Sequence, residues 1–363
     1  MLSVLGATPT AAPGGGEVIS PGRRAGPPTA TGAGRAEIGP WPDDDQLLRL
    51  IESAAAAAAG SREDEMRGMP RESGRFGRYR IVREIDRGRF SVVYLASDPG
   101  SGRRVALKVA RPETMADAEL RRRFDLEMEL ASRLDHPNIA PVVGVGRVGP
   151  LGYLATAYVE GGTLADWLRA DAPPAPRQAA WLVREVAGAV GHAHGRGVLH
   201  LDLKPGNVLL GPGIAASPDD PGVVPLVIDF GLARLLDGGG AGPGGPALIG
   251  SPPYMAPEQV QRGASGCGTT ADIYALGVIL YELLVGRPPF LGASRLQTIR
   301  AVVEGVVVPP RRRRPSIPAG LEAICLKCLE RSPAGRYRTA EELGDDLGKF
   351  LDGGRMPTPG KAP

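Results

Sequence analysis

A segment at 198–210 gathers the densest group of chemically active side chains in this sequence. Asp202, Lys204 and Asn207 place an acid, a cation and an amide within six residues, between two short apolar runs. These groups suit proton acceptance, phosphate contact and metal coordination. A polar turn between apolar runs is the alternative, but His, Asp, Leu and Asn match at set offsets by chance in roughly one in 10⁵ start positions.

Two charged residues stand at the ends of apolar strands. Lys108 follows Val105-Ala106-Leu107, and Asp229 follows Val227-Ile228. A lysine in that position must be paired or solvated, because an unpaired buried charge is costly. Glu127, in the charged helical stretch 115–134, is a candidate partner, although no local spacing brings the two together. A surface lysine at a strand end is the open alternative.

Two glycine-containing segments are less specific by themselves. Gly88 lies between two predicted strands, where backbone N–H groups can approach a phosphate without a side chain in the way. A single glycine in a hairpin is more often a structural turn. Residues 250–258, which end in Ala256-Pro257-Glu258, resemble an ordinary loop when they are considered alone.

The elements that must position these residues fall into two groups. Alternating apolar residues predict strands at 79–85, 92–96 and 104–109, near the start of the globular part of the chain. Helical patterns dominate after about 163, with long apolar helices at 178–194, 271–286 and 319–330. Strands followed by helices in one chain indicate an α+β arrangement.

Composition excludes several classes of protein. The chain has 363 residues, 42% of them apolar and 23% charged, with a net charge of +3, which is too balanced for a general nucleic-acid binder. Its best apolar run, Ile273–Val285, contains Glu282 and is shorter than the roughly 20 residues of a membrane span. Three cysteines cannot form a disulfide framework. We also find no signal peptide and expect a cytoplasmic protein with no membrane segment and no nucleic-acid partner.

The two ends of the chain differ from its middle. Residues 1–77 are rich in Ala, Gly and Pro and predict a disordered extension, with a possible short helix at 43–59 and a polar linker at 60–77. Residues 353–363 predict a flexible tail. The globular domain is expected at 78–352.

In order along the chain, these segments resemble the signature set of protein kinases: a glycine-rich loop, a strand lysine, a helix glutamate, a catalytic loop, Asp-Phe-Gly and Ala-Pro-Glu. The sequence is most similar to the eukaryotic-like serine/threonine protein kinases of bacteria. The resemblance implies a bilobal protein-kinase fold, with a strand-rich lobe at 79–157 and a helical lobe at 158–352. It implies that ATP and Mg²⁺ bind between the lobes, and that a protein Ser or Thr hydroxyl is the acceptor.

The resemblance also assigns roles to the charged residues. Lys108 would hold the α- and β-phosphates and pair with Glu127. Asp202 would accept or orient the hydroxyl proton, and Lys204 would stabilise the γ-phosphate charge. Asn207 and Asp229 would hold magnesium, for which amide and carboxylate oxygens are suitable ligands. Glu258 would pair with Arg336 in a structural bridge, and Asp272 would cap the helix at 271–286 and brace the catalytic loop.

The nucleotide would lie among residues of the strand-rich lobe and the segment that follows it. Ile85 and Val93 would sandwich the adenine with Ala106 beside it, Thr156 would lie at the back, and Tyr158 and Val159 would contribute backbone groups. The nucleotide loop itself comprises Ile85, Asp86, Arg87, Gly88, Arg89, Phe90, Ser91, Val92 and Val93.

The sequence departs from the family pattern in two places. The loop keeps one of its three glycines, Gly88, while Asp86 and Ser91 occupy the other two positions, which predicts weaker or slower use of ATP. Leu201 replaces the arginine that, in this family, meets a phosphorylated activation-loop residue. Because Leu232–Ile249 contains no Ser, Thr or Tyr, we expect activity without phosphorylation of that loop, and we expect Ser251 to have a structural or substrate-positioning role.

Other interpretations remain open. The incomplete glycine loop allows a pseudokinase that binds nucleotide and acts as a scaffold, although the complete set of Lys108, Glu127, Asp202, Asn207 and Asp229 argues against it. A kinase of small molecules with the same fold is a third possibility, and Ala256-Pro257-Glu258 with the segment before it argues against that one. Cys325 and Cys328 predict buried free thiols, with a metal site as the alternative. Arg311–Arg314 predicts a solvated loop, with an acidic partner as the alternative. The sequence does not predict the protein substrate or the oligomeric state.

Overall fold

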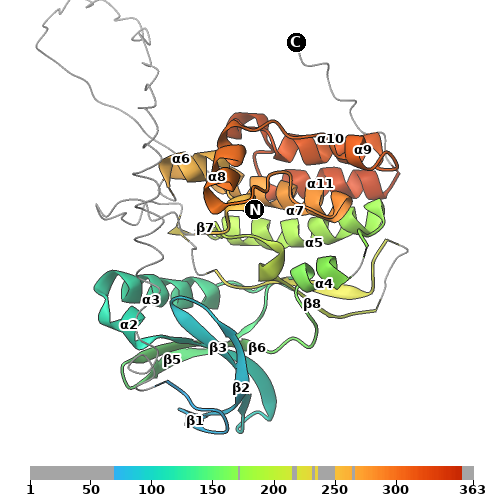
Figure 1. Ribbon diagram of the computed structural model, residues 1–363. Helices are drawn as coiled ribbons and strands as arrows, with labels where there is room; N and C mark the ends of the chain where they lie inside the picture. Colours follow the sequence, from blue (N-terminus) through green and yellow to red (C-terminus); the bar gives the residue numbers. More distant parts are fainter. Residues whose placement is uncertain are drawn as a thin grey trace, which may run out of the picture. The chain divides into compact units, whose positions relative to one another are not determined.

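The computed structural model describes residues 69–170, 172–214, 219–230, 234–235, 250–263 and 266–353. The predicted helix at 43–59, most of the extension at 1–77, most of the segment 232–249 and the tail after 353 lie outside these residues. Within them, a strand-rich small lobe is followed by a mainly helical large lobe, as Figure 1 shows, so the predicted α+β, two-lobed architecture is confirmed.

The small lobe is a six-stranded antiparallel sheet with two helices packed on it. The strand order is β1-β2-β3-β4-β6-β5, and every pairing is antiparallel. The strands are β1 Arg75–Phe76, β2 Tyr79–Arg87, β3 Ser91–Asp98, β4 Arg103–Ala110, β5 Val142–Val148 and β6 Leu151–Ala157. Their apolar faces bury a core that includes Tyr79, Tyr94 and Leu107.

This lobe begins earlier than the sequence predicts. Met69 and Phe76 are buried in the small-lobe core, and β1 pairs with β2. The extension expected over 1–77 therefore ends before residue 69, because two isolated apolar side chains in a polar stretch suffice to anchor the backbone to the sheet. Hydrophobic periodicity does not detect an element of this length.

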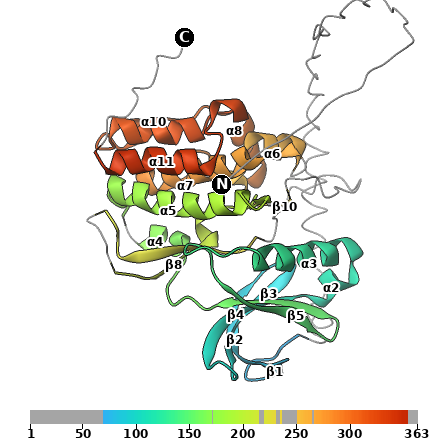
Figure 2. The same cartoon turned by 180° about the vertical axis from the view of Figure 1, so that it is seen from behind.

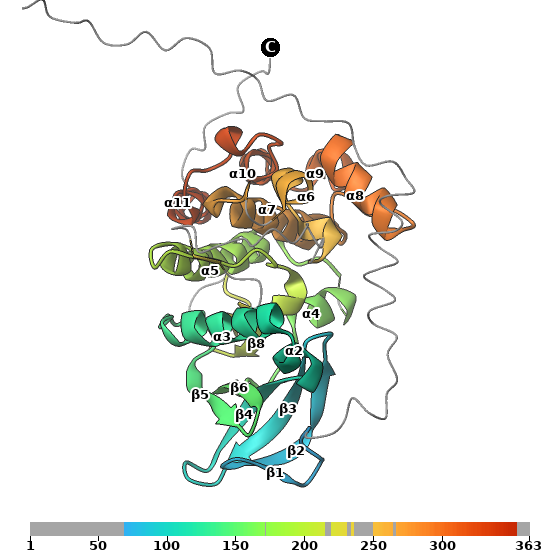
Figure 3. The ribbon, with the colours of Figure 1, turned by 90° about the vertical axis from the view of Figure 1, so that its left-hand side faces the viewer.

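The charged stretch 115–134 forms two helices instead of one. Helix α2 is Pro112–Ala116 and α3 is Ala118–Ser132. Asp117 separates them, because its carboxylate accepts hydrogen bonds from the N–H groups of Glu119 and Leu120 and so starts α3 as its N-cap. Figure 3 shows α3 between the sheet and the helices of the large lobe.

The large lobe consists of stacked helices with short strands near the small lobe. Figure 2 shows α5, α7, α10 and α11 packed together. The helices are α4 Leu164–Ala170, α5 Pro176–His194, α6 Pro257–Arg262, α7 Thr269–Val285, α8 Arg295–Glu304, α9 Pro310–Arg313, α10 Ala319–Cys328 and α11 Ala340–Leu351, with 3-10 turns at Pro205–Asn207, Pro252–Tyr254 and Pro333–Gly335. The strands are β7 Val198–Leu199, β8 Val208–Pro212, β9 Val223–Val227 and β10 Arg234–Leu235.

Helix α7 is the centre of this lobe. Its residues are buried on nearly every side, as expected for a helix that is apolar all round. Gly277 allows α10 to approach closely, since a Cβ at that position would lie 2.4 Å from Cβ of Cys328. In the part of the chain that the structure describes, no helix is both long and apolar enough to cross a membrane.

The prediction of a solvated loop at Arg311–Arg314 is wrong in part. Arg311 to Arg313 belong to α9. Arg313 donates to the hydroxyl of Tyr281 (3.1 Å), and Arg314 donates to the carbonyl groups of Pro174 (3.1 Å) and Leu284 (3.3 Å). These two cations therefore hold the C-terminal end of α7, where free carbonyls attract positive charge.

Candidate active site

Lys108 joins two carboxylates that come from distant parts of the chain. Its ammonium lies 2.5 Å from Oε1 of Glu127, on α3, and also contacts Oδ1 of Asp229. Burial alone would lower the pKa of Lys108, but the charges of Asp229 and Glu127 outweigh burial and raise it. Burial raises the pKa of Glu127. Burial would also raise the pKa of Asp229, but the positive charge of Lys108 outweighs it and lowers that pKa. The strand, the helix and the Asp-Phe-Gly segment thus share one charge cluster, in which Glu127 is buried and Asp229 is partly exposed.

The catalytic-loop residues predicted from the sequence also lie close together. Nζ of Lys204 is 2.6 Å from Oδ2 of Asp202, and the amide nitrogen of Asn207 donates to the backbone carbonyl of Asp202 at 2.8 Å. The N–H of Ser251 donates to Oδ1 of Asp202 at 3.2 Å. Ser251 therefore contacts the catalytic loop, as we expected for a structural or positioning residue.

Asp272 holds the backbone of this loop. Its buried carboxylate accepts hydrogen bonds from the N–H groups of His200 and Leu201 and from Nε2 of His194, each at 2.8 Å. The predicted capping role is wrong, because Gly268 is the N-cap of α7 and Asp272 lies within the first turn. Its oxygens are instead occupied by the loop, where Leu201 has a left-handed φ of 62°.

Leu201 itself lies in the apolar core of the large lobe. It is 4% exposed. Its carbonyl accepts a hydrogen bond of 2.6 Å from the side-chain amide of Gln259. A charged side chain at this buried position would need a compensating partner. An apolar side chain therefore suits this position, where the arginine of the family pattern would bind a phosphate.

The Asp-Phe-Gly segment is attached to the same loop. Asp229 adopts a φ of 65°, a conformation that costs energy for a residue other than glycine. The N–H of Ile228 donates to the carbonyl of Asn207 at 3.0 Å, and Nε2 of His200 lies 3.1 Å from the carbonyl of Ile228. Phe230 is buried, with its ring centroid 4.8 Å from that of His200. These contacts direct the Asp229 carboxylate toward Lys108.

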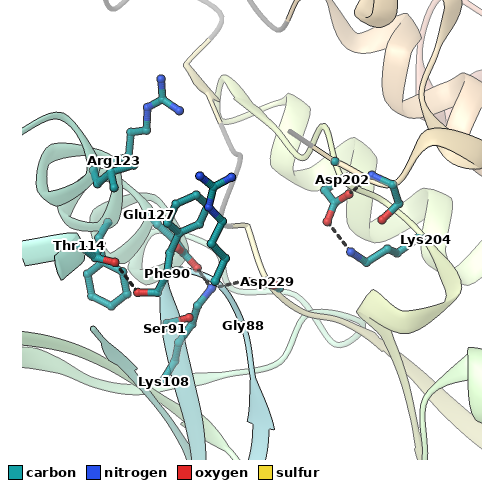
Figure 4. Close-up of a pocket in the computed structure, with 15 residues that line it drawn as sticks. Gly88, Phe90, Ser91, Lys108, Thr114, Arg123, Glu127, Asp202, Lys204 and Asp229 are labelled. Carbon is teal, nitrogen blue, oxygen red and sulfur yellow. Dashed lines mark hydrogen bonds and ion pairs between the residues drawn. The ribbon is translucent and has the colours of Figure 1, made fainter. Parts of the chain in front are cut away.

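One cavity of about 330 Å³ contains most of these groups (Figure 4). The predicted site residues that line it are Gly88, Arg89, Phe90, Ser91, Lys108, Glu127, Asp202, Lys204 and Asp229. Its other lining residues are Thr114, Leu120, Arg123, Phe124, Gly250 and Ser251. Figure 4 shows Lys108 with Glu127 and Asp229 on one side and Asp202 with Lys204 on the other.

The predicted adenine residues do not line this cavity, but several share one face of the sheet. Val93 pairs with Lys108 across β3 and β4, and Ala106 pairs with Thr156 across β4 and β6. Because cross-strand partners and alternate residues point to the same side, these four side chains lie on the half-buried face that carries Lys108. Ile85 is half-buried on the adjacent strand β2, whereas Val92 points into the opposite, core face.

The segment after β6 connects the two lobes. The N–H of Tyr158 donates to the carbonyl of Arg104 at 3.2 Å, and Val159 packs close to Gly211 in β8. Gly161 has a φ of 150°, and a Cβ there would lie 2.1 Å from the carbonyl oxygen of Leu210, so only glycine fits. The linker is therefore fixed to the large lobe just after Tyr158 and Val159.

Hydrogen bonds within the nucleotide loop and from residues of the following segment fix its backbone. Its turn is closed by a 2.9 Å bond from the N–H of Gly88 to the carbonyl of Ser91. The carbonyl of Phe90 accepts bonds from the hydroxyl of Thr114 (2.7 Å) and the N–H of Arg111 (3.0 Å). Asp86 is exposed and does not line the cavity, although it pairs across the strands with Val93, on the sheet face that carries Lys108. Arg87 likewise lies outside, in an ion pair with Glu84.

The prediction missed several residues of the cavity. Leu120, Arg123 and Phe124 precede Glu127 at spacings of seven, four and three, which place them on its side of a helix. That spacing was the available signal. No such pattern marked Thr114, because its contact with Phe90 depends on how α2 lies against the turn between β2 and β3.

The donor set of the site fits a magnesium–nucleotide group. The amide nitrogen of Asn207 is bound by the carbonyl of Asp202, so its amide oxygen points to the other side. This oxygen and the Asp229 carboxylate are hard ligands of the kind Mg²⁺ prefers, usually one or two from protein with the rest from phosphates and water. Among the described residues, no three His, Cys, Asp or Glu side chains gather as a metal cluster. Cys325 and Cys328 are buried free thiols, as predicted.

A buried ion pair holds the end of the segment 250–258. Arg336 donates to both carboxylate oxygens of Glu258, at 2.7 and 2.8 Å, and its side chain is fully buried. Glu258 begins α6, directly after the residues that carry Ser251. The pairing expected from the sequence is therefore present.

The chain resembles proteins of one family. The family model described as protein kinase domain matches residues 79–346. The serine/threonine-protein kinase PrkC of Bacillus subtilis is 36% identical over 280 residues, which cover 77% of this chain and 41% of PrkC. The serine/threonine-protein kinase PknB of Mycolicibacterium smegmatis is 36% identical over 281 residues, which cover 76% of this chain and 43% of PknB.

The structure is similar to a solved kinase domain as well. The crystal structure of the Mycobacterium tuberculosis PknI kinase domain matches with a TM-score of 0.57 and 30% identity, and the match covers 77% of this chain and 99% of that one. This chain matches less than half the length of PrkC and PknB. From the family model, these relatives and the fold, the chain belongs to the protein kinase family and is related within it to bacterial serine/threonine-protein kinases.

Proposed function

We propose that this chain transfers the γ-phosphate of MgATP to Ser and Thr hydroxyls of proteins. The observation that carries the proposal is the gathering of Lys108, Glu127, Asp229, Asp202 and Lys204 around one cavity. When bound, MgATP would supply the transferable phosphoryl group and the metal charge that neutralises its oxygens.

The residues of the chain would divide the work between binding and proton transfer. Lys108 would bind the α- and β-phosphates, with Glu127 fixing its ammonium in place. Asp229 and the amide oxygen of Asn207 would hold magnesium. The adenine would lie on the half-buried sheet face of Val93 and Ala106, with Ile85 and Thr156 beside it and with backbone groups of Tyr158 and Val159 at its edge.

Asp202 and Lys204 would act on the acceptor side. A carboxylate oxygen of Asp202 would accept the proton of the substrate hydroxyl as the oxygen attacks, and Lys204 would offset negative charge on the phosphoryl group. The contact between Lys204 and Asp202 supports these two roles. The ammonium of Lys204 would then lie beside both the carboxylate that accepts the proton and the phosphoryl group that is transferred.

The same proposal includes activity without phosphorylation of the activation loop. Leu201 is buried and uncharged where the family's arginine would receive a phosphate, and Leu232–Ile249 offers no hydroxyl to phosphorylate. Active protein should therefore carry no essential phosphate at Ser251. A phosphopeptide map that shows such a phosphate to be essential would contradict this part.

The alternative of a pseudokinase scaffold is favoured by Asp86 and Ser91 in two glycine positions of the loop. Purified full-length chain should transfer labelled γ-phosphate from ATP to a generic basic protein, should lose this activity with Asp202→Asn and should lose it again when magnesium is chelated. The Asp202→Asn variant should still bind nucleotide. Nucleotide binding without any transfer by the unaltered chain would favour the scaffold.

A further inference from the structure

Two arginines line the cavity although the proposed transfer does not require their side chains. Arg89 lies in the turn between β2 and β3, and Arg123 lies on α3, one helical turn before Glu127. Both line the same cavity as Asp202 and Ser251. Figure 4 shows Arg123 at the edge of the site, with its guanidinium directed away from Lys108.

The lining of the cavity carries a net charge of +1, and the cations without a carboxylate partner in the lining are these two arginines. Its lining residues include four cations and three carboxylates. Lys108 pairs with Glu127 and Asp229, and Lys204 pairs with Asp202. No carboxylate of the lining is left for Arg89 or Arg123, so the edge of the cavity is positive.

Neither arginine is strongly engaged by the part of the chain that the structure describes. Arg123 pairs with Glu119 across one helical turn, and both side chains are about half exposed, an arrangement that contributes little. The guanidinium of Arg89 lies 5.2 Å from the ring centroid of Phe90, and within the described ranges no carboxylate contacts it. Both guanidinium groups can therefore receive an anion from outside.

The surroundings favour an anion that belongs to the protein substrate. Leu120, Phe90 and Phe124 line the same cavity as the arginines and make part of its wall apolar. Gly250 and Ser251 form the facing wall, and Arg295 donates to the carbonyl of Gly250 at 3.3 Å, which adds another cation there. An acceptor hydroxyl that reaches Asp202 brings its neighbouring residues between these walls.

The chain cannot itself supply a phosphate from its activation loop. Leu232–Ile249 contains no residue that can be phosphorylated on a hydroxyl. Arg123 therefore has no phosphorylated residue of that segment to bind.

We propose that Arg89 and Arg123 form a subsite for an acidic side chain of the substrate, close in sequence to the Ser or Thr that is phosphorylated. The inference rests on the proposed kinase activity and adds the substrate class, acidic protein segments. A carboxylate can accept two N–H groups of a guanidinium side by side, which gives direction as well as charge.

The test compares peptides that share one length and one central Ser and differ only in flanking residues, which are Asp, Ala or Lys. At low salt, the full-length chain should phosphorylate the Asp peptide with a kcat/KM about tenfold above that of the Ala peptide, and the preference should fall as salt screens the charges. Arg89→Met and Arg123→Met should each reduce the preference by a factor of about three. Arg123→Glu should shift the preference toward the Lys peptide.

Arg83→Met is the matched control. Arg83 is an exposed residue on β2 that donates to the carbonyl of Glu84, does not line the cavity and carries the same charge. This variant should keep the full preference for Asp. The affinity for MgATP, measured directly by calorimetry, should be unchanged in Arg123→Met, because Arg123 lies on α3 and outside the nucleotide loop.

Three outcomes would overturn the inference. Equal rates with Asp and Ala peptides would refute the subsite and leave the kinase activity standing. A loss of MgATP affinity in Arg123→Met, with kcat/KM lowered equally for all peptides, would assign this arginine to nucleotide binding instead. Bound MgATP without transfer to any peptide would refute the proposed function, and the substrate class with it.

Discussion

Removing the Arg336 side chain should destabilise the large lobe strongly. All five N–H groups of its guanidinium have acceptors: Nη1 and Nη2 bind the carboxylate of Glu258, and the remaining protons bind the carbonyls of Thr270, Glu330 and Arg331 at 2.7–3.0 Å. In Arg336→Ala, Glu258 would be an unpaired buried carboxylate. Breaking a buried pair from one side costs about 3–5 kcal/mol.

The expected loss in free energy of unfolding is therefore about 4 kcal/mol, which corresponds to roughly 10 °C in Tm for a domain of this size. Arg336→Lys should lose less, because it keeps the charge but not the paired geometry. Urea denaturation of the purified variants measures the difference, provided that the slope of the transition is unchanged.

Arg338→Ala is the matched control. Arg338 pairs with Glu342, but its side chain is 87% exposed, and an exposed pair of this kind contributes about 0–1 kcal/mol. If Arg336→Ala and Arg338→Ala lowered the free energy of unfolding equally, the argument from burial would be wrong. Glu258 lies in the first turn of α6, shortly after Ser251, which contacts Asp202. We therefore also expect Arg336→Ala to lower the transfer rate under conditions in which the variant is still folded.

Four further changes have defined outcomes. Asp86→Gly combined with Ser91→Gly should raise MgATP affinity or the transfer rate, and no gain in a direct binding or rate assay would refute the argument from the loop. Leu201→Arg should place a charge in the apolar core, cost about 2 kcal/mol or more in urea denaturation and bring no increase in activity. Asp272→Asn should replace an acceptor oxygen by a donor that faces the loop, cost about 1–3 kcal/mol and lower kcat; unchanged stability and kcat would contradict the bracing role. Thr114→Val should release the carbonyl of Phe90 and weaken MgATP binding by a factor of about five, with equal affinity as the contrary result.

The order of the motifs and the main elements were accessible from the sequence, because both depend on local patterns. Alternation predicted β2, β3 and β4 to within a few residues, and helical periodicity predicted α5, α7 and α10. The break at Asp117 was missed although an acidic N-cap is a local signal, since the flanking helices continue the same charged pattern. Met69 and β1 were missed because two or three residues are too few for a period.

Residue type and spacing along one strand or helix were enough to predict which residues would carry the chemistry and in which elements they lie. The three-dimensional packing was needed to show that Lys108 meets Glu127 and Asp229, that Leu201 is buried and that Thr114 and Arg123 line the cavity. These contacts join residues of different elements. They depend on how the curved sheet, α3 and the catalytic loop pack in three dimensions, and no period along the chain records that packing.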